Sequence, residues 1–303
     1  MKTNLKSLAI AVLAGTALLS CTQPNHSEKV KKEIAIQLYS VRGILNNVQN
    51  SETHADTVYT NLLARLSAMG YTGVEAAGYA NGKFYGRTPE QFKADVEAAG
   101  MEVISSHCNK PLSAEELATG DFTPSLEWWK QCFADHKAAG MKYVVMPWMD
   151  VPQTLKDLAT YCTYYNAVGK LCKEQGMLFG YHNHSHEFVK VEGEVMFDYM
   201  LAHTNPDDVF FEMDVYWVVR GQSSPVDYFT KYPGRFKILH IKDHREIGQS
   251  GMVGFDAIFK NAVLAGTKEL VAEIEAYSMP VEESVKVSLD YLLDAPFVQA
   301  SYR

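Results

Sequence analysis

Amphipathic runs in this chain repeatedly end at a glycine, and each glycine is followed at once by a short apolar run. The pattern recurs over residues 66–77, 96–107, 136–148, 172–182 and 262–275. Helices often end in a left-handed residue, which glycine adopts without strain. The glycines at these positions are Gly70, Gly100, Gly140, Gly176 and Gly266. Repeated helix–glycine–strand units predict successive βα units and therefore a parallel sheet.

Three further apolar runs, at residues 34–40, 209–215 and 236–242, bring the number of expected strands to eight. Thr88 and Thr123 each precede a proline, which is typical of a helix N-cap and its first turn. Eight strands alternating with about eight helices predict a (β/α)8 TIM barrel, formed as one domain over residues 34–303. A doubly wound open sheet is the alternative, but no GxGxxG loop follows any of the strands.

Four consecutive expected strands end in side chains that bind divalent cations. The fifth strand ends at His182, and Asp214, His240 and Glu273 end the next three. The strand ends of a parallel barrel meet at one rim, where nitrogen and oxygen ligands suit one divalent ion such as Mn²⁺, Mg²⁺ or Zn²⁺. Taken singly, a salt bridge would also account for Asp214, and a hydrogen-bonded core histidine would account for His240.

Five ionisable side chains at or near these strand ends are candidates for acid–base catalysis. They are His184, Glu187, Lys242, Glu275 and His182, which is also a candidate ligand. Strand alternation puts Glu273 and Glu275 on one face of the last strand, where two like charges would repel and raise each other's pKa. A cation close to both carboxylates is the expected resolution.

The first three strands end in polar groups that are typical of ligand binding, and an aromatic side chain comes after the sixth strand. These candidate substrate-binding residues are Gln37, Tyr39, Glu75, His107 and Trp217. Polar groups around a cation, without a cluster of Arg and Lys for phosphate, favour a neutral hydroxylated ligand such as a sugar. Lys242 and Arg220 leave a phosphorylated sugar as the alternative.

Residues 1–21 have a different pattern, with two lysines, an apolar run from Leu8 to Leu19 and then Cys21. The run is shorter than the roughly 20 apolar residues of a spanning helix and is typical of a signal peptide. Its cysteine predicts an exported bacterial lipoprotein held at the membrane only through lipidated Cys21, and an ordinary secretory signal is the alternative. Residues 22–33 are polar and predict a flexible tether.

Charge and cysteine content argue against two other classes of protein. The net charge of −8 opposes binding to the phosphates of nucleic acids. The remaining cysteines form no CxxC motif, so a zinc ribbon is excluded and buried free thiols are expected. They are Cys108, Cys132, Cys162 and Cys172.

The segments IQLYSVR (36–42), GVEAAGY (73–79), YHNHSHEF (181–188), DVYWV (214–218) and HIKDH (240–244) together resemble a known family. The resemblance is to the xylose isomerase-like TIM barrel superfamily, and more closely to its sugar phosphate isomerase/epimerase branch found in bacterial lipoproteins. It covers residues 34–295. Members bind a divalent metal through Glu, Asp, His and Glu after strands five to eight.

Carried over to this chain, the last three family ligands are Asp214, His240 and Glu273, with Glu275 as a rival for the fourth position. The first position holds His182, and Glu187 lies five residues later. The family's epimerases pass a proton between two metal-bound carboxylates, so the resemblance implies a sugar isomerase or epimerase that removes a proton next to a carbonyl. The histidine departs from that pattern.

The sequence supports three functional hypotheses. The first is a metal-dependent isomerase or epimerase of a sugar or keto-sugar. The second is a keto-glycoside lyase, hydratase or hydrolase on the same metal site, because a histidine base suits proton removal with subsequent loss or addition of a leaving group. The third is a lipid-anchored carbohydrate-binding protein without catalysis.

Overall fold

The computed structural model describes residues 31–49 and 55–303. The predicted signal peptide and most of the predicted tether therefore lie outside the described residues. Among the helices that are described, none combines the length and the apolar character needed to cross a membrane.

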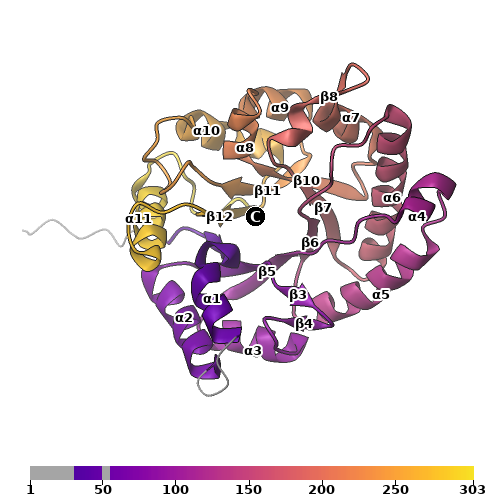
Figure 1. The fold of residues 1–303 in the computed structure, drawn as a ribbon. Coiled ribbons are helices and arrows are strands. Elements are labelled where there is room, and N and C mark those ends of the chain that lie inside the picture. The colour runs from indigo at the N-terminus through magenta and orange to yellow at the C-terminus, as the bar shows by residue number, and fades with distance from the viewer. Residues whose placement is uncertain (1–30, 50–54) are drawn as a thin grey trace, which may run out of the picture. The chain divides into compact units, whose positions relative to one another are not determined.

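Eight parallel strands close into a barrel at the centre of the ring of helices in Figure 1. Around the barrel the strands occur in the order β1, β12, β11, β10, β7, β6, β5 and β2, and β1 pairs with β12 to close the ring. Their bounds are β1 (Ala35–Gln37), β2 (Gly73–Ala76), β5 (Glu102–His107), β6 (Tyr143–Met146), β7 (Leu178–His182), β10 (Val209–Asp214), β11 (Phe236–Ile241) and β12 (Glu269–Ala272). The predicted (β/α)8 barrel is confirmed, and the open-sheet alternative is wrong.

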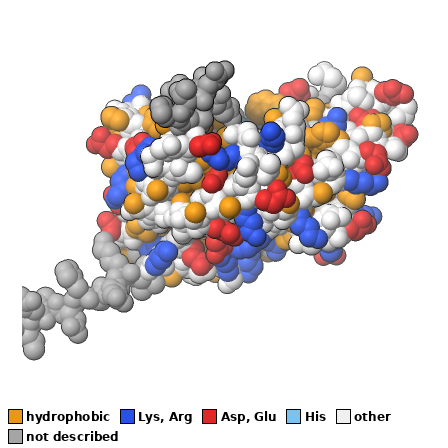
Figure 2. All heavy atoms as spheres, turned by 90° about the horizontal axis from the view of Figure 1, so that it is seen from below, with side chains coloured by type: hydrophobic (Ala, Val, Ile, Leu, Met, Phe, Trp, Pro, Cys, Tyr) orange, Lys and Arg blue, Asp and Glu red, His pale blue; other side chains and the backbone are white. Residues whose placement is uncertain are grey.

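Helices surround the barrel on its outside (Figure 1). They are α1 (Arg42–Gln49), α2 (Ala55–Met69), α3 (Pro89–Ala98), α4 (Ala114–Thr119), α5 (Thr123–Ala138), α6 (Leu155–Glu174), α7 (Met196–His203), α8 (Val215–Arg220), α9 (Pro225–Lys231), α10 (Phe255–Ala265) and α11 (Val281–Asp294). Two short hairpins, β3 (Tyr79–Ala80) with β4 (Lys83–Phe84) and β8 (Lys190–Val191) with β9 (Glu194–Val195), lie in the loops after β2 and β7. On the face drawn in Figure 2, acidic and basic side chains are interspersed.

Local signals in the sequence set most helix ends. The five glycines expected after helices all have positive φ angles, between 80° and 117°. Thr88 caps α3 through a reciprocal capping box with Gln91. The expectation that Thr123 is an N-cap was wrong, because α5 begins at Thr123 itself and the Thr123 N–H donates to Asp121 Oδ1 at 3.0 Å.

The barrel interior changes character along the strands. A small apolar cluster, separate from the larger core of the molecule, includes Ala35, Ile104, Phe210, Ile238 and Val271. Two residues after four of these five apolar residues, the chain carries a polar or ionisable side chain. These side chains are Gln37, Glu212, His240 and Glu273. Because side chains of a strand alternate between its faces, the inward positions are apolar near the strand starts and polar near the strand ends. The floor of the barrel is thus packed, and its carboxyl end carries the ionisable groups.

Close packing of α6 against the chain before β10 depends on a glycine. A Cβ added to Gly169 would lie 2.2 Å from the carbonyl oxygen of Asp208. We expect Gly169→Ala to destabilise the fold by about 2 kcal/mol or more, because overpacking forces the backbone apart. Gly43→Ala is the matched control, since a Cβ there meets nothing within 4 Å in α1, and it should be neutral or stabilising by up to about 1 kcal/mol. Urea unfolding of both variants measures this, and equal stabilities would contradict the packing argument.

Candidate functional site

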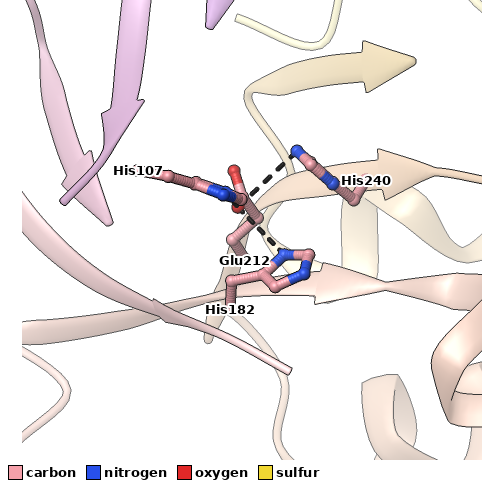
Figure 3. Close-up of side chains that lie close together, drawn as sticks. All are labelled: His107, His182, Glu212 and His240. Atoms are coloured by element: carbon pink, nitrogen blue, oxygen red, sulfur yellow. Dashed lines mark hydrogen bonds and ion pairs between the residues drawn. The ribbon is translucent and has the colours of Figure 1, made fainter. Parts of the chain in front are cut away.

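Two fully buried glutamates inside the barrel are paired with imidazoles. Glu212 on β10 accepts hydrogen bonds at its Oε2 from His107 Nε2 at 2.7 Å and from His182 Nδ1 at 3.1 Å. Glu75 on β2 accepts from His240 Nε2 at 2.6 Å, and His107 Nε2 also lies 3.2 Å from a Glu75 oxygen. Figure 3 shows the three rings of His107, His182 and His240 converging on Glu212 from three different strands. Burial of these carboxylates is tolerable because each is bonded to imidazole N–H groups.

This pairing fixes the protonation of the rings. Burial and the neighbouring imidazoles hold the pKa of His182 well below its ordinary value, so the ring is neutral. Because its Nδ1–H donates to Glu212, Nε2 is the nitrogen that keeps a lone pair. Burial opposes protonation of His240 too, but Glu212 and Glu75 outweigh it and raise the pKa of this ring. An environment that attracts a proton so strongly also favours a metal cation in its place.

A second group, at the ends of β10, β11 and β12, has donor atoms left without partners. One ligand atom each from Asp214, His240 and Glu273 lie within 4.8 Å of one another. Asp214 Oδ2 and His240 Nδ1 are buried and make no hydrogen bond with the described residues, although His240 Nδ1 lies 3.5 Å from Glu273 Oε2. Buried polar atoms are normally hydrogen-bonded, so these two atoms, together with the carboxylate of Glu273, fit a cation that all three residues bind.

His240 has the orientation of a metal ligand. Its Nε2–H is held by the Glu75 carboxylate, which leaves Nδ1 toward Asp214 and Glu273. A carboxylate on the far nitrogen of a ligating histidine is a recurrent feature of metal sites, because it sets the tautomer and orients the ring. Gln37 extends this support by donating from Nε2 to the same Glu75 oxygen at 2.7 Å.

Asp214 is oriented by the start of α8, directly after it in the chain. It is the N-cap of α8, and its Oδ1 accepts from the Trp217 backbone N–H at 2.8 Å. The Asp214 N–H donates in turn to Asn183 Oδ1 at 3.2 Å. With Oδ1 engaged, Oδ2 is the atom left for a ligand. Burial is the main reason that the pKa of Asp214 is raised to about 7.

A deeper group of donor atoms, formed by His107, His182, Glu212 and His240, would also be close enough to hold a cation. One nitrogen of each of its three rings is already bonded to a glutamate, although Glu212 Oε1 has no hydrogen-bond partner among the described residues. The rim group of Asp214, His240 and Glu273 therefore fits a metal better, and the deeper group fits an orienting layer beneath it. His182, which the sequence predicts as the first of four ligands, belongs to the deeper group and not to the rim group.

The last strand of the barrel has a cation close to both of its carboxylates, as expected. This cation is the Lys242 ammonium, which is ion-paired with Glu275 and with Glu273, at 3.1 Å from Glu273 Oε2. Burial would raise the pKa of Glu273, but Lys242 and His240 outweigh it and lower the pKa. Of the two carboxylates, Glu273 belongs to the candidate ligand group. Lys242 is committed to these ion pairs, so it is a structural counter-charge here.

A pocket of about 410 Å³ opens beside this group. Of the residues expected to act at the site, Tyr39, His107, His182, His184, Glu273 and Glu275 line it. Gln37, Glu75 and Trp217 do not line it, and the first two lie in the buried layer described above. No arginine or lysine is among the described residues that line the pocket.

Glu187 is directed elsewhere. It is fully buried, accepts from the Tyr181 hydroxyl and from the His184 backbone N–H, each at 2.8 Å, and does not line the pocket. It therefore holds the loop after β7 in shape. Of the two candidates after the fifth strand, His182 is the one that reaches the site.

Glu212 and Trp148 belong to the site but were not among the predicted site residues. Glu212 could have been found from its charge at an inward position of a buried strand, two residues before Asp214. Trp148 lines the pocket and packs against the rings of His184 and His186, with centroids at 4.9 and 4.3 Å. No signal in the sequence distinguished it from an ordinary rim aromatic.

A family model, a relative and two solved structures are similar to this chain. The family model for the xylose isomerase-like TIM barrel matches residues 63–295. Inosose dehydratase 2 of Bacillus cereus (strain ZK / E33L) is 24% identical over 254 residues, which span 78% of this chain and 80% of that protein. The structure of a sugar phosphate isomerase/epimerase from Parabacteroides distasonis ATCC 8503 is 34% identical, with a TM-score of 0.79, and the match covers 90% of this chain and 97% of that one. The IOLI protein, solved with a zinc atom, shares the fold at 13% identity and a TM-score of 0.62, covering 86% of this chain and 97% of that one.

The two groups of donor atoms can be separated by substitution. Asp214→Asn should weaken metal binding by more than about 100-fold, because it removes a direct ligand. Glu212→Gln should weaken it by about 10- to 100-fold, as expected for a group that only orients ligands. Metal analysis after equilibration with Mn²⁺ or Zn²⁺ measures both, and chelation should lower the melting temperature of the wild type. Full occupancy in Asp214→Asn with loss in Glu212→Gln would assign the metal to the deeper group.

Proposed function

This chain belongs to the xylose isomerase-like TIM barrel family, and we propose that it is a divalent-metal-dependent enzyme acting on a neutral keto-sugar. In the proposed reaction a proton is removed from the carbon next to the carbonyl, and a hydroxyl or glycosidic oxygen leaves from the carbon beyond it. In the reverse direction, the oxygen adds to that same carbon. The protein would thus be a lyase or hydratase. The single observation that carries this proposal is that two walls of the pocket present different ionisable groups, imidazoles on one and carboxylates on the other.

The wall from β7 carries imidazoles and the wall from β12 carries carboxylates. His182 and His184 line the pocket from the β7 side, and Glu187, the acidic residue of that loop, is turned away. Glu273 and Glu275 line it from the β12 side. Moving a proton from one face of a sugar carbon to the other suits two bases of matched strength, whereas elimination suits one base and a different acid. An imidazole wall facing carboxylates favours elimination.

The residues divide into three roles. Asp214, His240 and Glu273 would hold the metal, and a divalent cation bound there would polarise the carbonyl of the sugar. Glu275 is the proposed base, because it lines the pocket beside the ligand group and keeps 30% of its side chain exposed. His107 is the proposed donor to the leaving oxygen. Burial opposes its protonation, but Glu75 and Glu212 outweigh burial and raise the pKa of His107, so the ring can carry a second proton on Nδ1 while its Nε2–H donates to Glu212.

A neutral substrate is supported by the charges around the pocket. No lysine or arginine is among the described lining residues, and Lys242 of the site is already ion-paired with Glu273 and Glu275. Phosphate recognition usually relies on Arg or Lys, so a phosphorylated sugar would find no free lysine or arginine among the described residues that line the pocket. Exposed Trp148 offers an aromatic face on which a sugar ring would stack.

The relatives support both the leading proposal and one alternative. The dehydratase from B. cereus removes water from its substrate by name, in agreement with a lyase. The P. distasonis relative is described as a sugar phosphate isomerase/epimerase, which supports an epimerase as the second candidate. Both reactions begin with the same proton abstraction, so they differ only in the step after it. The zinc in the IOLI protein supports metal dependence in this fold.

Proton exchange separates the candidates. The metal-loaded protein is incubated in D2O with 3-keto-glucose and with a methyl 3-keto-glucoside, and carbon-bound protons are monitored by NMR. We expect exchange next to the carbonyl together with release of methanol or water, and Glu275→Gln should slow the exchange by about 10²- to 10⁴-fold with metal content unchanged. Glu283→Gln, on the exposed surface of α11, is the matched control and should behave as wild type.

Recovery of a sugar epimer, with no leaving group released, would reject the lyase in favour of the epimerase. If Glu275→Gln exchanges protons at the wild-type rate, Glu275 is not the base. Absence of exchange with every ketose, in protein shown to hold metal, would reject both enzymatic proposals.

A further inference from the structure

A cluster of two thiols and an imidazole lies beside the pocket but outside the candidate metal centre. Cys108 comes directly after β5, and Cys132 and His136 lie one turn apart on α5. The sulfur atoms of Cys108 and Cys132 are 3.3 Å apart, and Cys132 Sγ lies 3.4 Å from His136 Nδ1. All three side chains are buried, yet Cys108 lines the pocket between His107 and Asn109. One thiol of the pair therefore has a route to small solutes and the other does not.

Cys108 also differs chemically from the other described thiols. Burial opposes its ionisation, but hydrogen bonds from Cys132 and His136 outweigh burial and lower the pKa of Cys108. Burial raises the pKa of Cys162 to about 12, and it raises the pKa of Cys172 as well. The thiolate is the reactive form of cysteine, so Cys108 is the nucleophile of the set.

The imidazole of the cluster favours thiol chemistry over cation binding. His136 Nδ1 lies 2.6 Å from the Cys132 carbonyl oxygen, a distance that requires Nδ1 to donate its proton to that oxygen. A nitrogen that carries a proton has no lone pair for a metal. Nδ1, the ring nitrogen 3.4 Å from Cys132 Sγ, is therefore not available as a metal ligand.

We propose that Cys108 is a covalent modification site, where a hydroperoxide entering through the pocket oxidises its thiolate and Cys132 completes a Cys108–Cys132 disulfide. The Cys108 sulfur attacks one peroxide oxygen, the O–O bond breaks, and the other oxygen leaves as hydroxide or alkoxide. The Cys132 sulfur then attacks the Cys108 sulfenic acid, the S–O bond breaks, and the hydroxyl leaves as water with the Cys132 proton. The protein loses two electrons and two hydrogens, and the peroxide is reduced.

Formation of the disulfide would alter the pocket. The sulfur atoms must close from 3.3 Å to about 2.05 Å, so Cys108 moves toward α5. Its chain neighbours His107 and Asn109 both line the pocket, and His107 is bonded to Glu212. Oxidation is therefore expected to displace groups that face the substrate, and a thiol reductant would return them.

The test is oxidation of the full-length protein with hydrogen peroxide, after copper and iron are removed and Mg²⁺ is supplied. Intact mass should show loss of two hydrogens, peptide mapping should join Cys108 to Cys132, and dithiothreitol should reverse both changes. Cys132→Ser should gain one oxygen at Cys108 instead. Cys172→Ser is the matched control, because it removes a buried thiol outside the pair and should form the same disulfide.

Several results would overturn the proposal. One is a wild-type protein in which Cys108 remains reduced, and another is oxidation of Cys162 or Cys172 at an equal rate. Wild-type peptide mapping answers this even if Cys132→Ser fails to fold. Protection of both thiols by one equivalent of Zn²⁺ in the Asp214→Asn protein would identify the cluster as a cation site and would also reject the proposal.

Discussion

Neutralisation of two buried glutamates organises the carboxyl end of this barrel. The closed barrel buries Glu75 and Glu212 completely, so these carboxyl groups persist only because His107, His182 and His240 are bonded to them. The cost of burying these carboxylates therefore fixes where three rings point. It also decides which ring nitrogen each histidine has left for a ligand. The chemistry of the rim depends on that buried layer.

The inward side chains of these strands are apolar at the strand starts and ionisable at the strand ends. Near the strand starts, apolar side chains such as Phe210 and Ile238 fill the barrel and stabilise it. Two residues further along, the ionisable side chains of Glu212 and His240 take the same face and are fully buried. A rigid floor of close-packed side chains holds the layer above it in place, which an active site needs because small displacements of catalytic groups weaken catalysis strongly. The apolar layer thus stabilises the barrel, and the next layer of the same interior carries the ionisable groups.

Around the pocket, the loops add contrasts of charge and reactivity. Lys242 compensates Glu273 and Glu275, so a cationic residue that could have bound phosphate is used to stabilise acidic groups. Glu187 folds back on its own loop and leaves imidazoles on that wall. The thiol of Cys108 sits next to His107 in the chain, so the proposed acid of the reaction and the proposed site of oxidation share one segment. The pocket therefore combines a substrate site and a candidate covalent switch.

The sequence alone determined the barrel, the ends of five helices, the start of α3 and the rim where Asp214, His240 and Glu273 meet. These features depend on local periodicity, on glycine at left-handed positions, and on the rule that parallel strand ends share one edge. Only the tertiary structure decided that Glu212 is bonded to His107 and His182, that Glu187 is turned away from the pocket, and that Lys242 lies between two carboxylates. Such outcomes depend on partners brought together from distant strands, as with His240 and Glu75, which are 165 residues apart. A pattern along one strand records which face a side chain occupies, but the charge that it meets across the barrel comes from another strand.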